Sequence, residues 1–412
     1  VAEILAEMTR NGEAAVQFYA RKFDDWNREF ILTEAQKKAQ IAELSSSVKR
    51  DIDFAHEQIT AFARKQKESL HSFEFERNGV ILGQKVIPVD CAGCYVPGGR
   101  YAHVASALMS IATAKIAGVP YIIAASPPRD GNIHPATIYA MDAAGADMIL
   151  QMGGVHAIAS LARGLFTQQP ADIIVGPGNA YVAEAKRILF GEVGIDIFAG
   201  PTESAIIADH SADPLTIAID LVSQAEHGPQ SPVWLFTTDT ELGKEVIERM
   251  PELIEKMPNS EVCLQAWQDC GEVIVAESRE EVARISDRYA PEHLQVMAGD
   301  IEWWKTRLRN YGSLFLGEGS TVTHGYKCSG PNHILPTKKA ARYSGGLNVQ
   351  KFMKILTYQE LTAEANRTFS PVASRISRLE GMEGHARACD WRLEKFFPDK
   401  TDWDFPVYRH KS

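Results

Sequence analysis

The spacing of apolar positions along the chain changes at about residue 80. Residues 1–75 carry mixed charge with apolar residues at helical spacing, as in QITAFARKQKESLHSF (58–73), which predicts amphipathic helices. Beyond them, short apolar runs rich in Val and Ile alternate with helical patterns. The runs that we expect to form buried strands are 121–126, 146–151, 171–176, 204–209, 232–237 and 272–277. The helices expected between and after them are 103–118, 135–145, 155–165, 179–191 and 213–227.

This alternation predicts an α/β fold built from βαβ units, with mainly parallel sheets. The six strands could form one large sheet, but the Gly-Pro-rich stretch FAGPTES (198–204) looks like a seam between two halves. We therefore expect two Rossmann-like domains, with helical segments at both ends of the chain. The first comprises residues 1–98 with 205–347 and includes the N-terminal helices; the second comprises 99–204. The polar residues 348–412 form a separate helical segment.

Composition narrows the class of protein. The chain has 412 residues, is 45% hydrophobic and carries a net charge of −10, which suits a globular protein with two or more cores and argues against nucleic-acid or membrane partners. No apolar run approaches the roughly 18 residues that span a bilayer. The opening stretch, with its acidic residues, predicts an amphipathic helix and not a signal peptide. Six cysteines are few for this length, so we expect free thiols and a cytoplasmic location.

Several of the expected strands lead into a Gly-rich turn and then a helix, and three segments share this design. They are YVPGGRYAHVAS (95–106), QMGGVHAIAS (151–160) and VGPGNAYVAEAK (175–186). Glycine lets a ligand approach the backbone, and helix N-termini offer free N–H groups to phosphate, so a nucleotide pyrophosphate could bind here. The fingerprint GxGxxG is absent, and any one of these turns alone is more typical of a plain helix start.

Several polar residues are candidates for metal binding or proton transfer. Gln224 and His227 are three residues apart at the end of a helical pattern, so they share a face that could hold a metal ion. In APEHLQ (290–295), Glu292 and His293 could act as a general acid–base pair, although two polar residues in a surface loop is the simpler interpretation. Glu380 and His385 are five residues apart, which predicts a turn between them.

The segment THGYKCSGPNHILPTKKAARYSGG (323–346) contains four cations and no acid. A basic loop in an acidic chain suits an anionic substrate or a cofactor phosphate. A solvated basic loop with no ligand is the alternative.

Taken in order, the chain resembles the histidinol dehydrogenase family over nearly its whole length. The matching blocks are YVPGG (95–99), LMSIATAKIAGV (108–119), GGxxAIA (153–159), GPGNxYVxxAK (176–186), IDIFAGPTE (195–203), SQAEH (223–227), APEHL (290–294), SGPNHILPT (329–337) and EGxxxH (380–385).

The resemblance implies roles for the matching positions. It makes Gln224, His227 and His385 zinc ligands, Glu292 and His293 the catalytic pair, and His333 and Glu380 substrate contacts. The turns around Tyr95, Pro97, Gly153 and Asn179 would bind NAD, which makes 99–204 the NAD-binding domain. Family members are homodimers with intertwined C-terminal segments, so 348–412 would serve dimerisation and His385 would complete the partner's site.

The resemblance also implies a mechanism for a small-molecule substrate. Zinc anchors the substrate, and His293 takes the hydroxyl proton as hydride leaves to NAD. In members that take a second oxidation step, Glu292 activates water against the aldehyde.

Two positions depart from the family pattern. In the family, the fourth zinc ligand is an aspartate seven residues before the His of the NHxLPT motif, and this chain has Tyr326 there, a possible but uncommon ligand. Zinc is therefore weaker, differently coordinated or absent. His156 stands where the family usually has Gln near the nucleotide.

Charge bears on the substrate. Histidinol is cationic and calls for carboxylates, whereas residues 321–346 contain none. This segment looks most like the sulfopropanediol dehydrogenase branch of the family, which oxidises 2,3-dihydroxypropane-1-sulfonate to sulfolactate. We expect NAD-dependent oxidation of a small anionic primary alcohol, possibly on to the carboxylate, with Lys327 or another loop cation near the anion. Histidinol oxidation and a non-catalytic ligand-binding protein are the alternatives.

Overall fold

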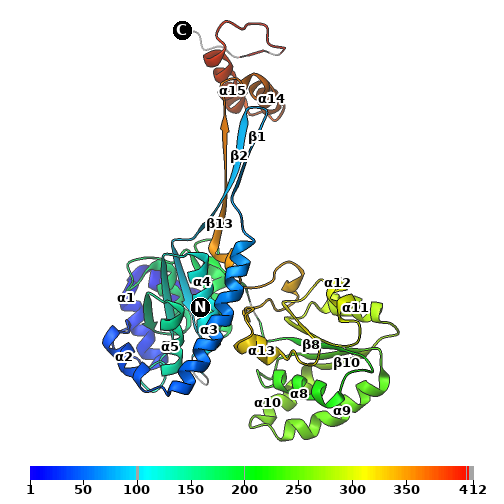
Figure 1. Ribbon diagram of the computed structural model, residues 1–412. Helices are drawn as coiled ribbons and strands as arrows, with labels where there is room; N and C mark the ends of the chain where they lie inside the picture. Colours follow the sequence, from blue (N-terminus) through cyan, green and yellow to red (C-terminus); the bar gives the residue numbers. More distant parts are fainter. Residues whose placement is uncertain (99–101, 199, 405, 408–412) are drawn as a thin grey trace. The chain divides into compact units, whose positions relative to one another are not determined.

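The computed structural model describes residues 1–98, 102–198, 200–404 and 406–407. The chain forms two compact units (Figure 1). The large unit comprises Val1–Ser69 and Pro88–Phe352, and the small unit comprises Leu70–Ile87 and Met353–Ser412. Among the described residues, no helix is both long and apolar enough to cross a membrane.

The first sheet of the large unit has five parallel strands in the order β5-β4-β3-β6-β7. Helices α1, α6 and α7 bury their apolar residues on one face, and α3, α4 and α5 pack together on the other (Figure 1). The strands are β3 (Cys91–Tyr95), β4 (Tyr121–Ser126), β5 (Met148–Gln151), β6 (Ile173–Val175) and β7 (Gly194–Ile195). The helices are α1 (Ala2–Asp24), α2 (Glu34–Ala42), α3 (Ser46–Glu68), α4 (Val104–Ala117), α5 (Pro135–Ala144), α6 (Gly154–Arg163) and α7 (Ala180–Leu189).

The second sheet also has five parallel strands, in the order β10-β9-β8-β11-β12. Successive residues of β8 alternate between its faces: Ile206 packs with α8, α9 and α10, whereas Ala205 and Ile207 pack with α11 and α12. The strands are β8 (Ser204–Ala208), β9 (Val233–Thr237), β10 (Gly271–Val275), β11 (His293–Met297) and β12 (Ser313–Leu316). The helices are α8 (Pro214–Ala225), α9 (Thr240–Glu255), α10 (Ser260–Cys270), α11 (Arg279–Tyr289), α12 (Ile301–Arg307) and α13 (Val322–Lys327), followed by short helices at Ala340–Arg342 and Val349–Phe352.

These sheets confirm the α/β fold with two Rossmann-like, mainly parallel halves. One sheet made from all six expected strands is wrong, because the chain starts a new sheet after the 198–204 stretch.

The N-terminal residues do not follow the expected domain division. Residues 1–98 were expected with 205–347, but α1 packs against α6, α3 packs against α4 and α5, and β3 lies at the centre of the first sheet. The apolar face of α1, which includes Leu5, Met8 and Val16, is buried in the core of that sheet. Burial of this face therefore places the N-terminal helices with the sheet that follows them directly in sequence.

The small unit is not purely helical. Two distant stretches form a three-stranded sheet in the order β1-β2-β13, with β1 (Phe73–Arg77) antiparallel to β2 (Val80–Pro88). The third strand, β13 (Met353–Leu361), leads into α14 (Asn366–Leu379) and α15 (Glu383–Phe396). Most residues of β1 and β13 are exposed, so their sequences lack the buried alternation from which strands are predicted.

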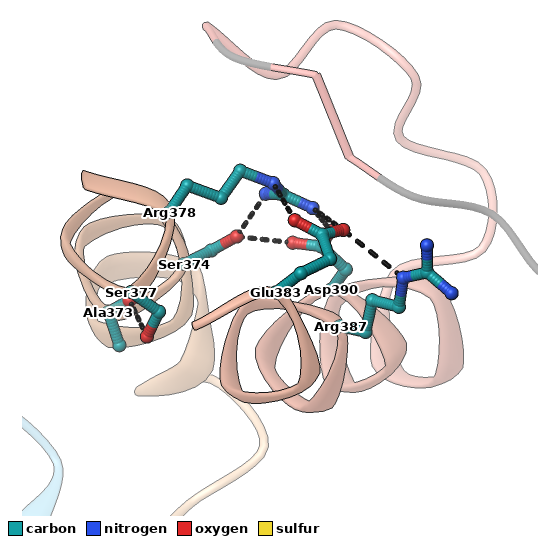
Figure 2. Close-up of polar contacts among 7 residues, drawn as sticks. All are labelled: Ala373, Ser374, Ser377, Arg378, Glu383, Arg387 and Asp390. Atoms are coloured by element: carbon teal, nitrogen blue, oxygen red, sulfur yellow. Dashed lines mark hydrogen bonds and ion pairs between the residues drawn. The ribbon is translucent and has the colours of Figure 1, made fainter. Parts of the chain in front are cut away.

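A buried polar network joins α14 to α15 (Figure 2). Asp390 is fully buried and accepts hydrogen bonds from Ser374 Oγ at 2.6 Å and Arg378 Nη2 at 2.7 Å. The same guanidinium binds Glu383, which also accepts from Arg387 Nε at 3.1 Å. A buried carboxylate needs such partners, so the network fixes how the two helices pack and where the turn between them lies.

Candidate active site

Glu292 and His293 lie at the amino end of β11, a central strand of the second sheet. His293 pairs in parallel register with Ser204 of β8, which places Glu203 beside both candidates. Glu292 and His293 are only 6% and 1% exposed. The surface-loop interpretation of APEHLQ is therefore wrong, because the pair starts a buried strand.

The hydrogen bonds of His293 define its tautomer. Its backbone N–H and its Nδ1 lie 3.1 and 3.2 Å from the carbonyl oxygen of Glu203. A carbonyl can only accept, so Nδ1 carries the hydrogen and Nε2 keeps a free electron pair. Nε2 is buried and has no hydrogen-bond partner among the described residues. Burial lowers the pKa of His293 to about 3, which leaves a neutral imidazole able to accept a proton.

Two carboxyl groups lie next to this imidazole. Glu292 Oε2 accepts from the backbone N–H of Glu203 at 3.0 Å and lies 3.5 Å from His293 Nδ1. Burial, with the charge of Glu203 adding to it, raises the pKa of Glu292 well above its ordinary value. Burial also raises the pKa of Glu203, and the hydrogen bond that its carboxylate accepts from the Lys338 backbone N–H at 2.7 Å opposes this shift. Glu203 was given no role from the sequence, although it ends the matching block 195–203.

Tyr326, at the end of α13, lies between the candidate residues. Its hydroxyl donates to Gln224 Oε1 at 3.1 Å. Its ring centroid is 4.8 Å from that of His293, 5.2 Å from His227 and 5.8 Å from His333. Burial, with the charge of Glu292 adding to it, raises the pKa of Tyr326 well above its ordinary value. The phenol is thus a neutral hydrogen-bond donor at the centre of the cluster.

His333 connects this cluster to the first sheet. Its Nδ1 lies 3.0 Å from the Tyr326 carbonyl oxygen, and its Nε2 lies 3.0 Å from the Ser106 hydroxyl on α4. Burial lowers the pKa of His333 to about 4, and the charges of Lys327, His103 and His227 add to this effect. Lys327 is therefore a cationic group near His333, and its contact with a substrate stays a prediction.

The residues do not fit the zinc site that the resemblance implies. Among the described residues, no three side chains of His, Cys, Asp or Glu come together in a way that could hold a metal ion. Gln224 and His227 do face one side chain, but it is Tyr326, whose hydroxyl already engages the amide oxygen that a metal would need.

The predicted nucleotide turns meet at one place in the first sheet. The chain runs from β3 outward to β5 and then returns to β6 on the other side of β3, and ligands of such sheets bind where the strand order reverses, beyond the carboxyl ends. Tyr95 and Pro97 follow β3, and Asn179 follows β6. Asn179 caps α7 by accepting from the N–H groups of Tyr181 and Val182 at 3.0 and 3.1 Å.

A buried ion pair holds the turn after β6. Lys186 Nζ donates to the Gly176 carbonyl at 3.0 Å and pairs with Asp196. Asp196 also accepts from the Gly176 N–H at 2.7 Å. A side chain at Gly176 would meet the Tyr95 carbonyl, at 1.9 Å. The backbone of the turn after β6, at Gly176, therefore lies directly against the backbone at the end of β3, at Tyr95.

A cleft of about 360 Å³ lies beside these turns. Its lining includes Pro97, Gly98, Ser126, Pro127 and Arg129, and it reaches the start of α5. This arrangement fits a nucleotide, because glycine backbone and a cation face one space. Part of the first turn, including Gly99, lies outside the described residues.

His156 and Gly153 lie on the opposite side of the same region. Gly153 begins α6, and the next N–H, that of Gly154, donates to the Tyr95 hydroxyl at 3.3 Å. His156 is 2% exposed, and its Nε2 lies 2.9 Å from Asp24 of α1. Its side chain therefore binds the N-terminal helix, so a direct contact with NAD stays a prediction.

Glu380 and His385 belong to the small unit. Both are exposed, and Glu380 ends α14 whereas His385 lies in the first turn of α15. The predicted turn between them is confirmed, with Gly381 at φ 77°. Their part in the site stays a prediction.

Known proteins share this architecture. The family model for histidinol dehydrogenase matches residues 1–393. Sulfopropanediol 3-dehydrogenase of Ruegeria pomeroyi is 54% identical over 405 residues, covering 97% of this chain and 93% of the relative. Histidinol dehydrogenase of Methanocaldococcus jannaschii is 40% identical over 396 residues, covering 96% and 92%. The crystal structure of histidinol dehydrogenase from Elizabethkingia anophelis matches with a TM-score of 0.90 at 32% identity, covering 96% of this chain and 91% of the other.

The fold, the buried acid–base residues and these matches together define an oxidoreductase. The chain belongs to the histidinol dehydrogenase family, which confirms the resemblance seen in its sequence blocks.

Proposed function

We propose that this chain is an NAD-dependent dehydrogenase that oxidises a small anionic primary alcohol, such as 2,3-dihydroxypropane-1-sulfonate. The observation that carries the proposal is the neutral, buried His293, whose Nε2 has no partner among the described residues. A buried group with a free electron pair suits removal of a hydroxyl proton.

The neighbouring residues support proton transfer at His293. The Glu203 carbonyl holds Nδ1–H, so Nε2 is the atom that accepts the substrate proton. The imidazolium that results lies 3.5 Å from Glu292, whose carboxylate would stabilise its charge. Pro97 and Gly98 of the cleft would hold NAD, which would supply the hydride acceptor.

Glu292 would serve a second oxidation step. Its raised pKa makes its ionised form a stronger base than an ordinary carboxylate. A water molecule that loses a proton to Glu292 could add to the bound aldehyde, and the resulting hydrate would give the carboxylate by losing a second hydride to a second NAD.

Charge favours an anionic substrate. Lys327 and His103 lie near enough to His333 for their charges to lower its pKa, and residues 321–346 bring no carboxylate. One of two relatives at 54% identity is named sulfopropanediol 3-dehydrogenase, and the other is named a histidinol dehydrogenase homolog. Histidinol is the alternative, favoured by relatives named histidinol dehydrogenase.

We also propose a homodimer in which the C-terminal segment 348–412 serves dimerisation and His385 and Glu380 reach the partner's site. The supporting feature is an exposed apolar face along α14, at Phe369, Val372, Ile376 and Leu379, whose spacing of three and four residues places it on one side of the helix. The six cysteines are free, which supports a cytoplasmic location.

Purified protein with NAD and a panel of alcohols tests the activity, with NADH absorbance as the measurement. We expect turnover of 2,3-dihydroxypropane-1-sulfonate or a carboxylated analogue and little turnover of histidinol. Turnover of histidinol alone would reject the anionic substrate. Tight binding of an alcohol with no NADH from any of them would favour the non-catalytic alternative.

A further inference from the structure

We propose that Tyr326 takes the place of a metal ion in this chain, so that Gln224 and His227 do not bind zinc. The inference goes beyond the proposed function and does not depend on which alcohol is oxidised. It stands on the position of one phenol and on the contacts of the residues around it.

The hydrogen bonds of Gln224 show which of its atoms meets the phenol. Its Nε2 donates to Ser223 Oγ at 3.2 Å, and its Oε1 accepts from the Tyr326 hydroxyl at 3.1 Å. An amide binds a metal only through its oxygen, because the nitrogen carries two hydrogens and no free pair. The phenol therefore engages the atom that a metal would need.

The Tyr326 ring also fills the space among the imidazoles. It lies between His227, His293 and His333, with ring centroids separated by 4.8 to 5.8 Å. Zinc binds nitrogen and oxygen ligands at about 2.0–2.2 Å, so an ion at this position would require the ring to leave.

The backbone of α13 resists such a movement. Gly325 packs so closely on Phe315 of β12 that a Cβ there would lie 2.6 Å from the ring. On the other side, the Tyr326 carbonyl lies 3.0 Å from His333 Nδ1. Because the backbone is held at Gly325 and at Tyr326, α13 cannot move away and carry the Tyr326 ring out of the cluster.

The test compares the full chain with Tyr326→Asp and Tyr326→Phe. Each protein is incubated with zinc, passed through a desalting column and assayed for metal by mass spectrometry. We expect wild type and Tyr326→Phe to retain no zinc and Tyr326→Asp to retain about one per chain. Zinc should also raise the melting temperature of Tyr326→Asp and leave that of wild type unchanged.

Two results would overturn the proposal. One is about one zinc per wild-type chain that is lost in His227→Ala. The other is a folded Tyr326→Asp variant that still binds no zinc, since Tyr326 would then not be what excludes the ion. Wild type that lacks zinc and oxidises none of the alcohols would reject the proposed function and leave this inference standing.

Discussion

The Nδ1 hydrogen of His293 is held by the backbone carbonyl of Glu203, 3.2 Å away at the start of the neighbouring strand. The imidazole orientation is thus fixed by backbone and not by a side chain. Substitution of Glu203 would change the charge of the site without releasing the histidine.

Replacing His293 tests its role as the proton acceptor. His293→Gln should lower the rate of alcohol oxidation by about 10²–10⁴-fold, the usual contribution of a general base, as measured by NADH formation. His324→Gln is the matched control, because His324 is exposed on α13 and has no part in the site. Equal losses in both variants would contradict the role of His293.

The lowered pKa of His293 predicts a stability effect. The folded value is about 3, below the ordinary 6.5, so the unfolded chain binds more protons between these values. This contribution is fully present above about pH 6.5 and is lost as pH falls toward 3. We expect His293 alone to lower the free energy of unfolding by about 2 kcal/mol between pH 7 and pH 5. In urea unfolding, His293→Gln should lose this part of the pH dependence and His324→Gln should keep it.

The Lys186–Asp196 pair should be important for stability. Lys186→Met leaves a buried carboxylate without its cation, which typically costs about 3–5 kcal/mol, so the melting temperature should fall clearly. Arg187→Met is the control, since Arg187 pairs with Glu184 on the exposed face of the same helix. A melting temperature of Lys186→Met that matches that of Arg187→Met would show that the buried pair is dispensable.

Tight packing at Gly153 predicts an effect on NAD. A Cβ there would lie 2.5 Å from Cβ of Pro127, so Gly153→Ala must shift the turn beside the cleft. A loss of about 1.4 kcal/mol in binding would raise the Kd for NAD tenfold, measurable by fluorescence titration. Gly319→Ala has no heavy atom within 4 Å of the new Cβ and should bind NAD normally. Unchanged affinity in Gly153→Ala would place the nucleotide elsewhere.

The apolar face of α14 predicts a dimer interface. Ile376 is 50% exposed, and Ile376→Glu should convert the protein to a monomer in analytical ultracentrifugation. Ile247 on α9 is 46% exposed, so Ile247→Glu makes the same change elsewhere and should leave the dimer intact. A wild-type protein that is itself monomeric would reject this interface.

The sequence predicted six strands of the two parallel sheets, because buried parallel strands appear as short apolar runs, but it missed β3 and β11, which are also fully buried. The run at 121–126 coincides with β4, and 204–209 differs from β8 by one residue. The strands β1 and β13 were missed because most of their residues are exposed. In their sheet, β13 pairs with β2, although the two strands are far apart in the chain. A pattern of neighbouring residues cannot predict such pairing.

The site was predictable in its residue types but not in its environment. Glu292 and His293 could be named as candidates from their position in the chain, whereas their burial depends on the pairing of β11 with β8. The place of Glu203 beside Glu292 and His293 follows only from that pairing. The hydrogen bond between Tyr326 and Gln224 depends on where α13 packs. The sequence could therefore show that tyrosine replaces the expected aspartate, but not that its hydroxyl binds Gln224.

The acid–base pair lies at the amino end of β11, which leaves the opposite rim of the second sheet without a part in the proposed chemistry. The connections on that rim, after β8, β9, β10 and β11, can lengthen or shorten without moving Glu292 or His293. Variation among relatives should therefore accumulate there, and a tag or a fused domain is best inserted at the same rim.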